Sequence, residues 1–236
     1  MFATVINAVC VAIASIIGVL FKNKINEKYT SAILTGLAIV VGIIGVTYAI
    51  ETEDVLGIII CMALGTLLGE ILRIEDHLEN FGDRLKARFE KGDGKNSSFT
   101  QSFVAGSLLF CIGPMAILGS LQAGTVGDAT IILSKTVIDS VAALSFAVAM
   151  GIGVIFSGVS VLIYQGIITL LAVWISPFLG DSIITEMSAA GGILMIGIAI
   201  NMLGMRKEKI RVGNMLPALF LPIFYQPFVQ WLTALF

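Results

Sequence analysis

Two ionisable side chains, Lys135 and Asp139, lie four residues apart within an otherwise apolar segment. In a helix this spacing places both on one face. Asp139 could bind a cation or a proton, with Lys135 as its counter-charge or as a ligand for an anionic group; alternatively, the two form a neutral structural pair. Ionisable residues within membrane segments commonly mark ion or substrate pathways. We therefore expect any working site to lie here.

The preceding stretch, 111–128, collects glycine, proline and small polar residues between two apolar segments. Pro114 removes a backbone donor, and with Gly113 beside it the stretch predicts a broken or kinked helix. Freed carbonyl groups could bind a cation and freed amides an anion; alternatively, neighbouring helices satisfy the kink. Ser120 and Gln122 would supply the polar lining of such a site.

Glu186 and two amides extend the set of candidates. Small residues follow Glu186 in the sequence, and they allow a helix or a solute to approach closely. Glu186 is either a second ligand of the same site or a carboxylate at the membrane interface. Asn7 and Asn201 lie in apolar segments, where they would bridge helices or line a path.

The chain lacks the sequence motifs of common enzymatic and metal sites. The chain has no His-Glu-x-x-His zinc motif, no nucleophile elbow and no P-loop. Its three cysteines, Cys10, Cys61 and Cys111, lie in apolar runs without metal-ligand spacing. We expect no enzymatic activity, no metal, no cofactor and no nucleic-acid partner.

Composition identifies the environment of these residues. The 236-residue chain has a mean hydropathy of +1.00 and only 13% charged residues, whereas soluble domains carry about 25%. We predict a single integral membrane domain over 1–236, an all-α polytopic bundle in contact with the lipid bilayer. Apolar segments of spanning length predict eight spans, at 3–21, 31–50, 55–73, 101–121, 130–151, 158–178, 183–204 and 213–234.

Charge placement supports this count. Every basic residue except Lys135 falls in one of three loops, after the first, third and seventh spans. The opposite loops carry only acidic charges, on Glu51, Glu53, Asp54, Asp128 and Asp181. The positive-inside rule places the basic loops in the cytoplasm and both termini outside. A model with seven spans would put the basic loop at 206–211 on the wrong side.

The long loop at 73–97 has a helical pattern of its own. Apolar residues recur at helical spacing between charged ones, at Ile74, Leu78, Phe81, Leu85 and Phe89. This pattern predicts a cytoplasmic amphipathic helix, which lies on the inner membrane surface or against the bundle.

Residues 109–128 read Leu-Phe-Cys-Ile-Gly-Pro-Met-Ala-Ile-Leu-Gly-Ser-Leu-Gln-Ala-Gly-Thr-Val-Gly-Asp, with Lys135 and Asp139 downstream. This pattern resembles the signature of the YqgA-like bacterial membrane proteins, the domain of unknown function 554 family. Similarity extends over essentially the whole chain, including Gln165-Gly166 and Thr185-Glu186. The resemblance implies a polytopic inner-membrane protein of a group sometimes labelled as transporters. It supplies no substrate and no catalytic residue.

Two functional hypotheses follow from these patterns. In the first, the protein is a small-solute or ion transporter or channel, a homodimer with its site beside the fourth, fifth and seventh spans. In the second, it is a non-transporting membrane scaffold or regulator that acts through its basic cytoplasmic loops. The transporter hypothesis requires a polar cavity that reaches Asp139. The scaffold hypothesis predicts that Lys135 and Asp139 are sealed in a contact without water.

Overall fold

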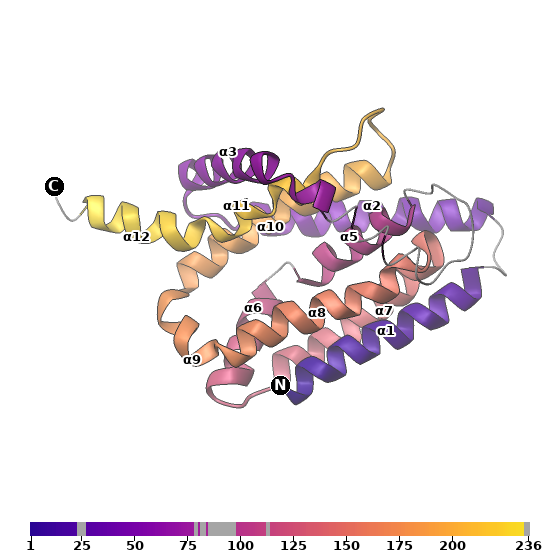
Figure 1. Ribbon diagram of the computed structural model, residues 1–236, viewed down its shortest axis with the longest axis horizontal. Helices are drawn as coiled ribbons and strands as arrows, with labels where there is room; N and C mark the ends of the chain where they lie inside the picture. The colour runs from indigo at the N-terminus through magenta and orange to yellow at the C-terminus, as the bar shows by residue number, and fades with distance from the viewer. Residues whose placement is uncertain (23–26, 78–79, 81–83, 85–97, 112–113, 234–236) are drawn as a thin grey trace.

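The computed structural model describes residues 1–22, 27–77, 80, 84, 98–111 and 114–233, and every regular element among them is helical (Figure 1). The elements in chain order are α1 (Phe2–Lys22), α2 (Glu27–Ala49), α3 (Val55–Leu72), α5 (Ser98–Cys111), α6 (Pro114–Thr125), α7 (Thr130–Met150), α8 (Gly153–Leu170), α9 (Ala172–Ile175), α10 (Asp181–Met202), α11 (Pro217–Phe220) and α12 (Pro222–Thr233), with 3-10 turns η1 (Ser176–Phe178) and η2 (Val212–Met215).

Six helices in the described ranges are long and apolar enough to cross a membrane: α1, the 31–49 part of α2, α3, α7, α8 and α10. Two further pairs reach that length only together. Gln101–Cys111 and Met115–Thr125 are bent by 57°, and Val212–Phe220 and Pro222–Leu232 by 41°. Counting each bent pair as one span gives eight. The predicted all-α polytopic bundle, with its broken fourth span, is confirmed.

Two prolines, Pro114 and Pro222, lie where the bent pairs divide, and Pro217 begins a helix within the second pair. Pro114 begins α6, Pro217 begins α11 and Pro222 begins α12. Proline is tolerated in the first turn of a helix because the amide it lacks would have no partner there. In a continuous helix the same residue would remove a hydrogen bond and clash with the preceding turn. Each of these three prolines therefore begins a new helix rather than continuing the old one.

α1 packs against α7 and α8, and α2 packs against α10 (Figure 1). Small residues bring these helices close together. A Cβ on Gly18 of α1 would lie 2.8 Å from Ala147 Cβ of α7. A Cβ on Gly45 of α2 would lie 2.7 Å from the carbonyl oxygen of Gly192 on α10. Backbone contact of this kind is how helices associate where lipid removes the hydrophobic drive between them.

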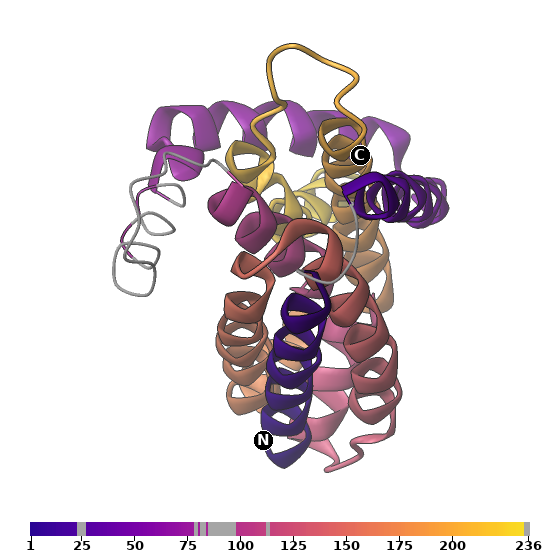
Figure 2. The same cartoon turned by 90° about the vertical axis from the view of Figure 1, so that its right-hand side faces the viewer.

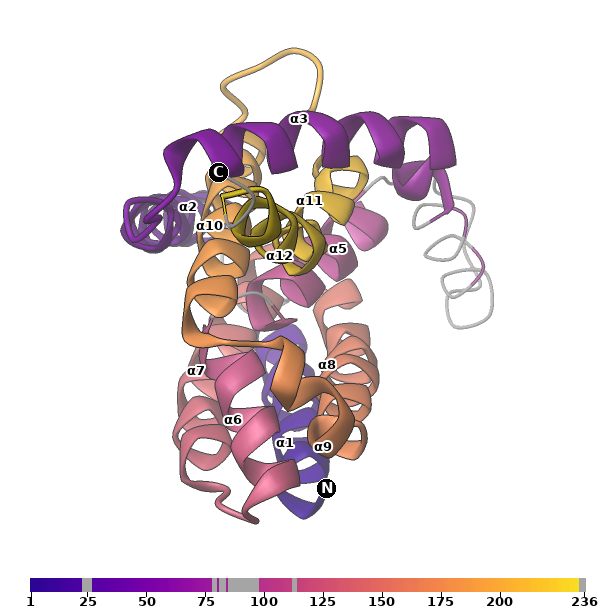
Figure 3. The ribbon, with the colours of Figure 1, turned by 90° about the vertical axis from the view of Figure 1, so that its left-hand side faces the viewer.

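α3 has the length of a span but lies across α10 instead of alongside it (Figures 2 and 3). Three glycines, Gly57, Gly65 and Gly69, line its inner face, where Gly65 packs on Ala218 and Gly69 on Asn214. Its other face is exposed and strongly apolar, with Val55, Leu56, Ile59, Leu64, Leu67, Ile71 and Leu72. Lipid can cover such a face, because hydrocarbon does not penalise exposed apolar side chains.

Two connections refine the predicted boundaries. The turn between α7 and α8 takes only Gly151 and Ile152, so α8 begins at Gly153 and not at the predicted 158. Gly151 has φ of +95°, a conformation that a residue with a side chain rarely adopts. Helix α3 ends at Leu72 with Arg73 as its C-cap, and 74–77 form a new helical turn. Most of the amphipathic helix predicted in 73–97 lies outside the described residues.

Candidate functional site

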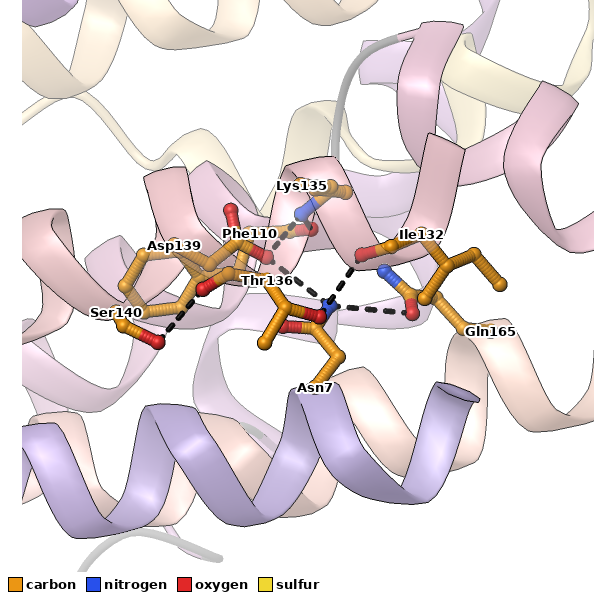
Figure 4. A network of polar contacts seen from close by, with 8 residues as sticks. All are labelled: Asn7, Phe110, Ile132, Lys135, Thr136, Asp139, Ser140 and Gln165. Carbon is orange, nitrogen blue, oxygen red and sulfur yellow. Dashed lines mark hydrogen bonds and ion pairs between the residues drawn. The ribbon is translucent and has the colours of Figure 1, made fainter. Parts of the chain in front are cut away.

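A buried polar network joins four helices near the break of the fourth span (Figure 4). We use this name for Asn7 of α1, the carbonyl of Phe110 of α5, Lys135 and Asp139 of α7, and Gln165 of α8. Lys135 and Asp139 form an ion pair, as their spacing on one helix face allows. Asn7 Nδ2 donates to Asp139 Oδ2 at 3.1 Å and to Gln165 Oε1 at 3.3 Å.

Lys135 also stabilises the end of α5. Its Nζ donates to the carbonyl oxygen of Phe110 at 2.7 Å, one residue before α5 ends at Cys111. The last carbonyl groups of a helix have no partner within that helix and carry partial negative charge. A cationic side chain placed there both satisfies an oxygen and complements the helix dipole. Part of the broken backbone is therefore paired by α7.

The network is sealed from its surroundings. Lys135 and Asp139 are 5% and 6% exposed, and Asn7 and Gln165 are fully buried. Removing two charges from water is costly, and their attraction compensates for it only when further hydrogen bonds satisfy both groups. Phe110 and Asn7 supply those bonds. The contact itself matches the dry pair that the scaffold hypothesis predicts.

Two atoms of this network nevertheless have no hydrogen-bond partner among the described residues: Asn7 Oδ1, an acceptor, and Gln165 Nε2, a donor. An unpaired buried polar group costs about 1–3 kcal/mol. By contrast, the nearby hydroxyls of Thr136 and Ser140 are satisfied within α7, by the carbonyls of Ile132 and Thr136 (Figure 4). The two amides thus leave one acceptor and one donor of the network without a partner among the described residues.

The other residues predicted for this region are arranged differently. Ser120 of α6 is fully buried, and its hydroxyl is also without a partner in the described part of the chain. Gln122 is exposed. Pro114 begins α6, and Gly113 lies outside the described residues. On the α5 side of the break, the carbonyl of Phe110 is paired with Lys135. On α6, the hydroxyl of Ser120 has no partner among the described residues.

Glu186 occupies a second, separate position on α10. It is 2% exposed, and its carboxylate accepts hydrogen bonds from the α2–α3 connection, residues 50–54. Asn201 is also engaged elsewhere: its side chain donates to the carbonyl of Ile210 and accepts from the amide of Ile210, both at 2.8 Å. These bonds hold the loop between α10 and η2. Neither residue takes part in the polar network.

The basic loops contact each other at one end of the molecule. Arg211 pairs with Glu70 at 3.4 Å and also with Asp76. The amide of Glu75 donates to Asn214 Oδ1 at 2.7 Å. The residues that follow α3 and the loop that precedes η2 therefore share one face, as the predicted topology requires.

Two other features do not form polar sites. Among the described residues, no group of three or more His, Cys, Asp or Glu side chains is placed to hold a metal ion. An apolar groove of about 370 Å³ lies beside α11 and α12, lined by Ile74, Leu216, Pro217, Phe220, Leu221 and Phe224. Its lining has no group that could bind an ion.

Sequence patterns found the ion pair but not the full set of network residues. The sequence predicts Asn7 as an amide in an apolar segment, whereas Gln165 belongs to the prediction only through the family resemblance. The sequence does mark Gln165 as a candidate, because a glutamine within the apolar 153–170 segment is as costly to bury as an asparagine. The partner of Lys135 at Phe110 could not be seen, since any residue carries a backbone carbonyl.

The described residues form six to eight apolar helices of spanning length and a sealed polar network that joins α1, α5, α7 and α8. These features define a polytopic helical membrane protein. The chain belongs to the family described as "Protein of unknown function (DUF554)", whose model matches residues 2–226. It is 30% identical over 226 residues to the "Uncharacterized membrane protein YdfK" of Bacillus subtilis (strain 168), covering 94% of both chains. It is 28% identical over 218 residues to the "Uncharacterized protein YqgA" of Escherichia coli (strain K12), covering 92% of both. No solved structure matches the chain.

Proposed function

We propose that this protein is a small-solute or ion transporter or channel, with its site in the polar network. One observation supports this above the others: the network buries an ion pair and leaves Asn7 Oδ1 and Gln165 Nε2 unpaired. A network that serves only to hold helices together gains by pairing every member, because each unpaired buried group destabilises the fold. A network that keeps an unpaired acceptor and an unpaired donor instead suits a small polar or charged species.

Burial of Asp139 has a definite meaning under this proposal. A transporter exposes its site to one side of the membrane at a time and passes through a state in which both sides are closed. The site lies near the interface of broken helices. The conformation described above is then an occluded one. Opening would separate Lys135 from Phe110 or from Asp139, because these contacts close the network.

The proposed setting is the cytoplasmic membrane of a bacterium, with the basic loops inside and both termini outside. The positive-inside rule supports this orientation, and the pairing of Arg211 with Glu70 and Asp76 is consistent with it. We also propose a homodimer, since the exposed apolar faces of α2 and α3 offer surface for a second copy. No enzymatic step and no cofactor form part of the proposal.

The alternative function is a non-transporting scaffold or regulator that acts through the basic loops. The dry contact between Lys135 and Asp139 favours it, because a purely structural pair would be sealed in this way. The two proposals differ in what the pair is for. Under the scaffold proposal, replacing both charges with apolar residues would leave function intact.

Flux in proteoliposomes tests the proposal. Purified protein would be assayed with a panel of monovalent cations, protons and small anions, beside an Asp139→Asn variant that is shown to remain folded. Asp128→Asn, at an exposed carboxylate outside the helices, is the matched control. A selective flux that Asp139→Asn abolishes and Asp128→Asn retains supports transport through the network. A flux that survives in Asp139→Asn moves the site elsewhere, and silence across the panel favours the scaffold.

A further inference from the structure

The contact between α1 and α8 carries two polar pairs near the N-terminal end of α1. Thr4 Oγ1 and Thr169 Oγ1 lie 3.3 Å apart, and both side chains are buried. One turn deeper, Asn7 Nδ2 donates to Gln165 Oε1 at 3.3 Å. Thr4 stands in the first turn of α1 and Thr169 in the last turn of α8. The two pairs therefore form a polar line from the end of these helices to the polar network.

Toward the other end of α1 the same contact is apolar and tight. Val11 of α1 and Val161 of α8 are fully buried. A Cβ on Gly158 of α8 would lie 2.8 Å from the carbonyl oxygen of Ala8 on α1. Backbones in such close contact leave no space for a solute between the helices. The polar part of the α1–α8 contact therefore leads toward the N-terminus, which the proposed topology places outside.

Helix α6 packs against α8 beside this polar line. A Cβ on Gly124 of α6 would lie 2.3 Å from the carbonyl oxygen of Thr169. α6 and α8 run in the same direction, and both end near the N-terminus of the chain (Figure 3). Ser120 lies one turn before Gly124 on the same face of α6, and Gln165 lies one turn before Thr169 on α8. This register places Ser120 at about the depth of Gln165.

Three helices thus bring unpaired polar groups to one depth. Asn7 Oδ1 is an acceptor, Gln165 Nε2 is a donor, and the hydroxyl of Ser120 can act as either. All three side chains are fully buried, and these atoms have no partner among the described residues. A cation site is built from several acceptor oxygens. The mixed set found here instead matches a solute that both donates and accepts hydrogen bonds.

Charge favours the same class of solute. Lys135 and Asp139 neutralise each other within the network. The side chains along the polar line are hydroxyls and amides, which carry no charge. An ion that entered between Thr4 and Thr169 would lose its hydration without meeting an opposite charge there, which is costly. An uncharged solute avoids this cost.

We propose that Asn7, Gln165 and Ser120 form a binding site for a small uncharged solute that donates and accepts hydrogen bonds. Thr4 and Thr169 gate its entry from the outer side. This inference rests on the proposed transport function and names its substrate class. The gate is closed in the conformation described above. Opening separates the two hydroxyls, and each can then bond to the solute as it passes.

Urea is the probe for the site, because it presents amide donors and a carbonyl acceptor. Its flux in proteoliposomes would be measured beside the ion panel and against protein-free vesicles. Ser120→Ala removes a hydroxyl that has no partner among the described residues, and it should lower urea flux about tenfold. Ser145→Ala is the matched control, since that hydroxyl bonds to the carbonyl of Val141 within α7. It should keep the parent flux.

A pair of cysteines tests the gate. The two hydroxyl oxygens lie 3.3 Å apart, so Thr4→Cys combined with Thr169→Cys should form a disulfide on oxidation. The native cysteines would be replaced by alanine in this protein. The disulfide should stop urea flux and a reductant should restore it. Oxidation should not affect the variant that carries Thr169→Cys alone.

The outcomes separate this inference from the transport function itself. Urea flux that Ser120→Ala leaves at the parent level overturns the site, and urea flux that survives the disulfide overturns the gate. Ion flux without urea flux overturns the whole inference and leaves the transport function standing. If neither urea nor any ion crosses the membrane, the transport function fails together with the inference. If the disulfide does not form, the comparison of Ser120→Ala with Ser145→Ala decides.

Discussion

Lys135 of α7 donates a hydrogen bond to the carbonyl oxygen of Phe110 in the last turn of α5, at 2.7 Å. The same ammonium group pairs with Asp139 one turn further along α7. A single side chain therefore connects the broken span to the carboxylate that is our candidate for the site. Any movement that opens the break must also change the environment of Asp139.

Removing one member of the ion pair should destabilise the fold severely. Lys135→Met leaves Asp139 buried without its cation, and Asp139→Leu leaves Lys135 buried without its anion. Each should lower the free energy of unfolding by about 3–5 kcal/mol, whereas the double variant should recover most of this loss. Thermal unfolding in detergent measures the three effects. A double variant as unstable as the singles would contradict the dry-pair geometry.

The two amides of the network should respond differently to substitution. Asn7→Leu removes the donor to Asp139 and to Gln165, so it should destabilise by about 1–3 kcal/mol. Gln165→Met is nearly isosteric. It removes Nε2, which has no partner among the described residues, and Oε1, which accepts from Asn7 Nδ2, while Asn7 keeps its bond to Asp139. The loss should therefore be about 1 kcal/mol. Flux measured on the Gln165→Met protein then shows whether this side-chain amide matters for function. Under the scaffold alternative, replacing the Gln165 amide does not affect function.

Glycine substitutions test the close approach of α1 to α7. In Gly18→Ala the new Cβ would lie 2.8 Å from Ala147 Cβ and would also meet the carbonyl of Leu144. We expect a loss of about 1–3 kcal/mol from this overpacking. Gly36→Ala on α2 is the control, since its Cβ would meet nothing within 4 Å. It should be neutral or stabilise by up to about 1 kcal/mol. Equal effects of the two substitutions would argue against this packing.

Accessibility to an impermeant thiol reagent checks the proposed topology. In a cysteine-free background, Lys207→Cys and Arg84→Cys should react only from the cytoplasmic side, because positive loops are retained there. Asp128→Cys, in the connection between α6 and α7, should react only from outside. Labelling of Lys207→Cys and Arg84→Cys from opposite sides would contradict the contacts that Arg211 makes with Glu70 and Asp76.

Asp128 should titrate at an unusually low pH. The hydroxyl and the amide of Thr130 both donate to its Oδ1, at 2.6 and 2.9 Å, and these bonds lower its pKa from the usual 3.8. A depressed pKa in the folded state means that the contribution to stability is present above pH 3.8 and is lost as the pH falls through the folded value. Thr130→Val should bring the pKa back towards its usual range. Carboxyl titration followed by NMR measures both proteins.

Hydropathy and charge placement determined the membrane class, the number of apolar segments and the residues of the ion pair. These properties are local: a run of apolar residues, a proline or an i, i+4 spacing has the same consequence in most surroundings. The break at Pro114 was predictable for that reason, because the missing amide acts within one turn of its own helix.

The three-dimensional structure alone decided which polar groups meet. Glu186 and Asp139 were candidates for one site, yet Glu186 bonds to the α2–α3 connection and Asp139 bonds to Asn7 and Lys135. Asn201 likewise holds the backbone of Ile210 instead of lining a path. Partners such as Asn7 and Asp139 lie more than a hundred residues apart in the chain. Their meeting depends on how helices pack, which is set by shape and close glycine contacts over the whole bundle and leaves no mark at either position in the sequence.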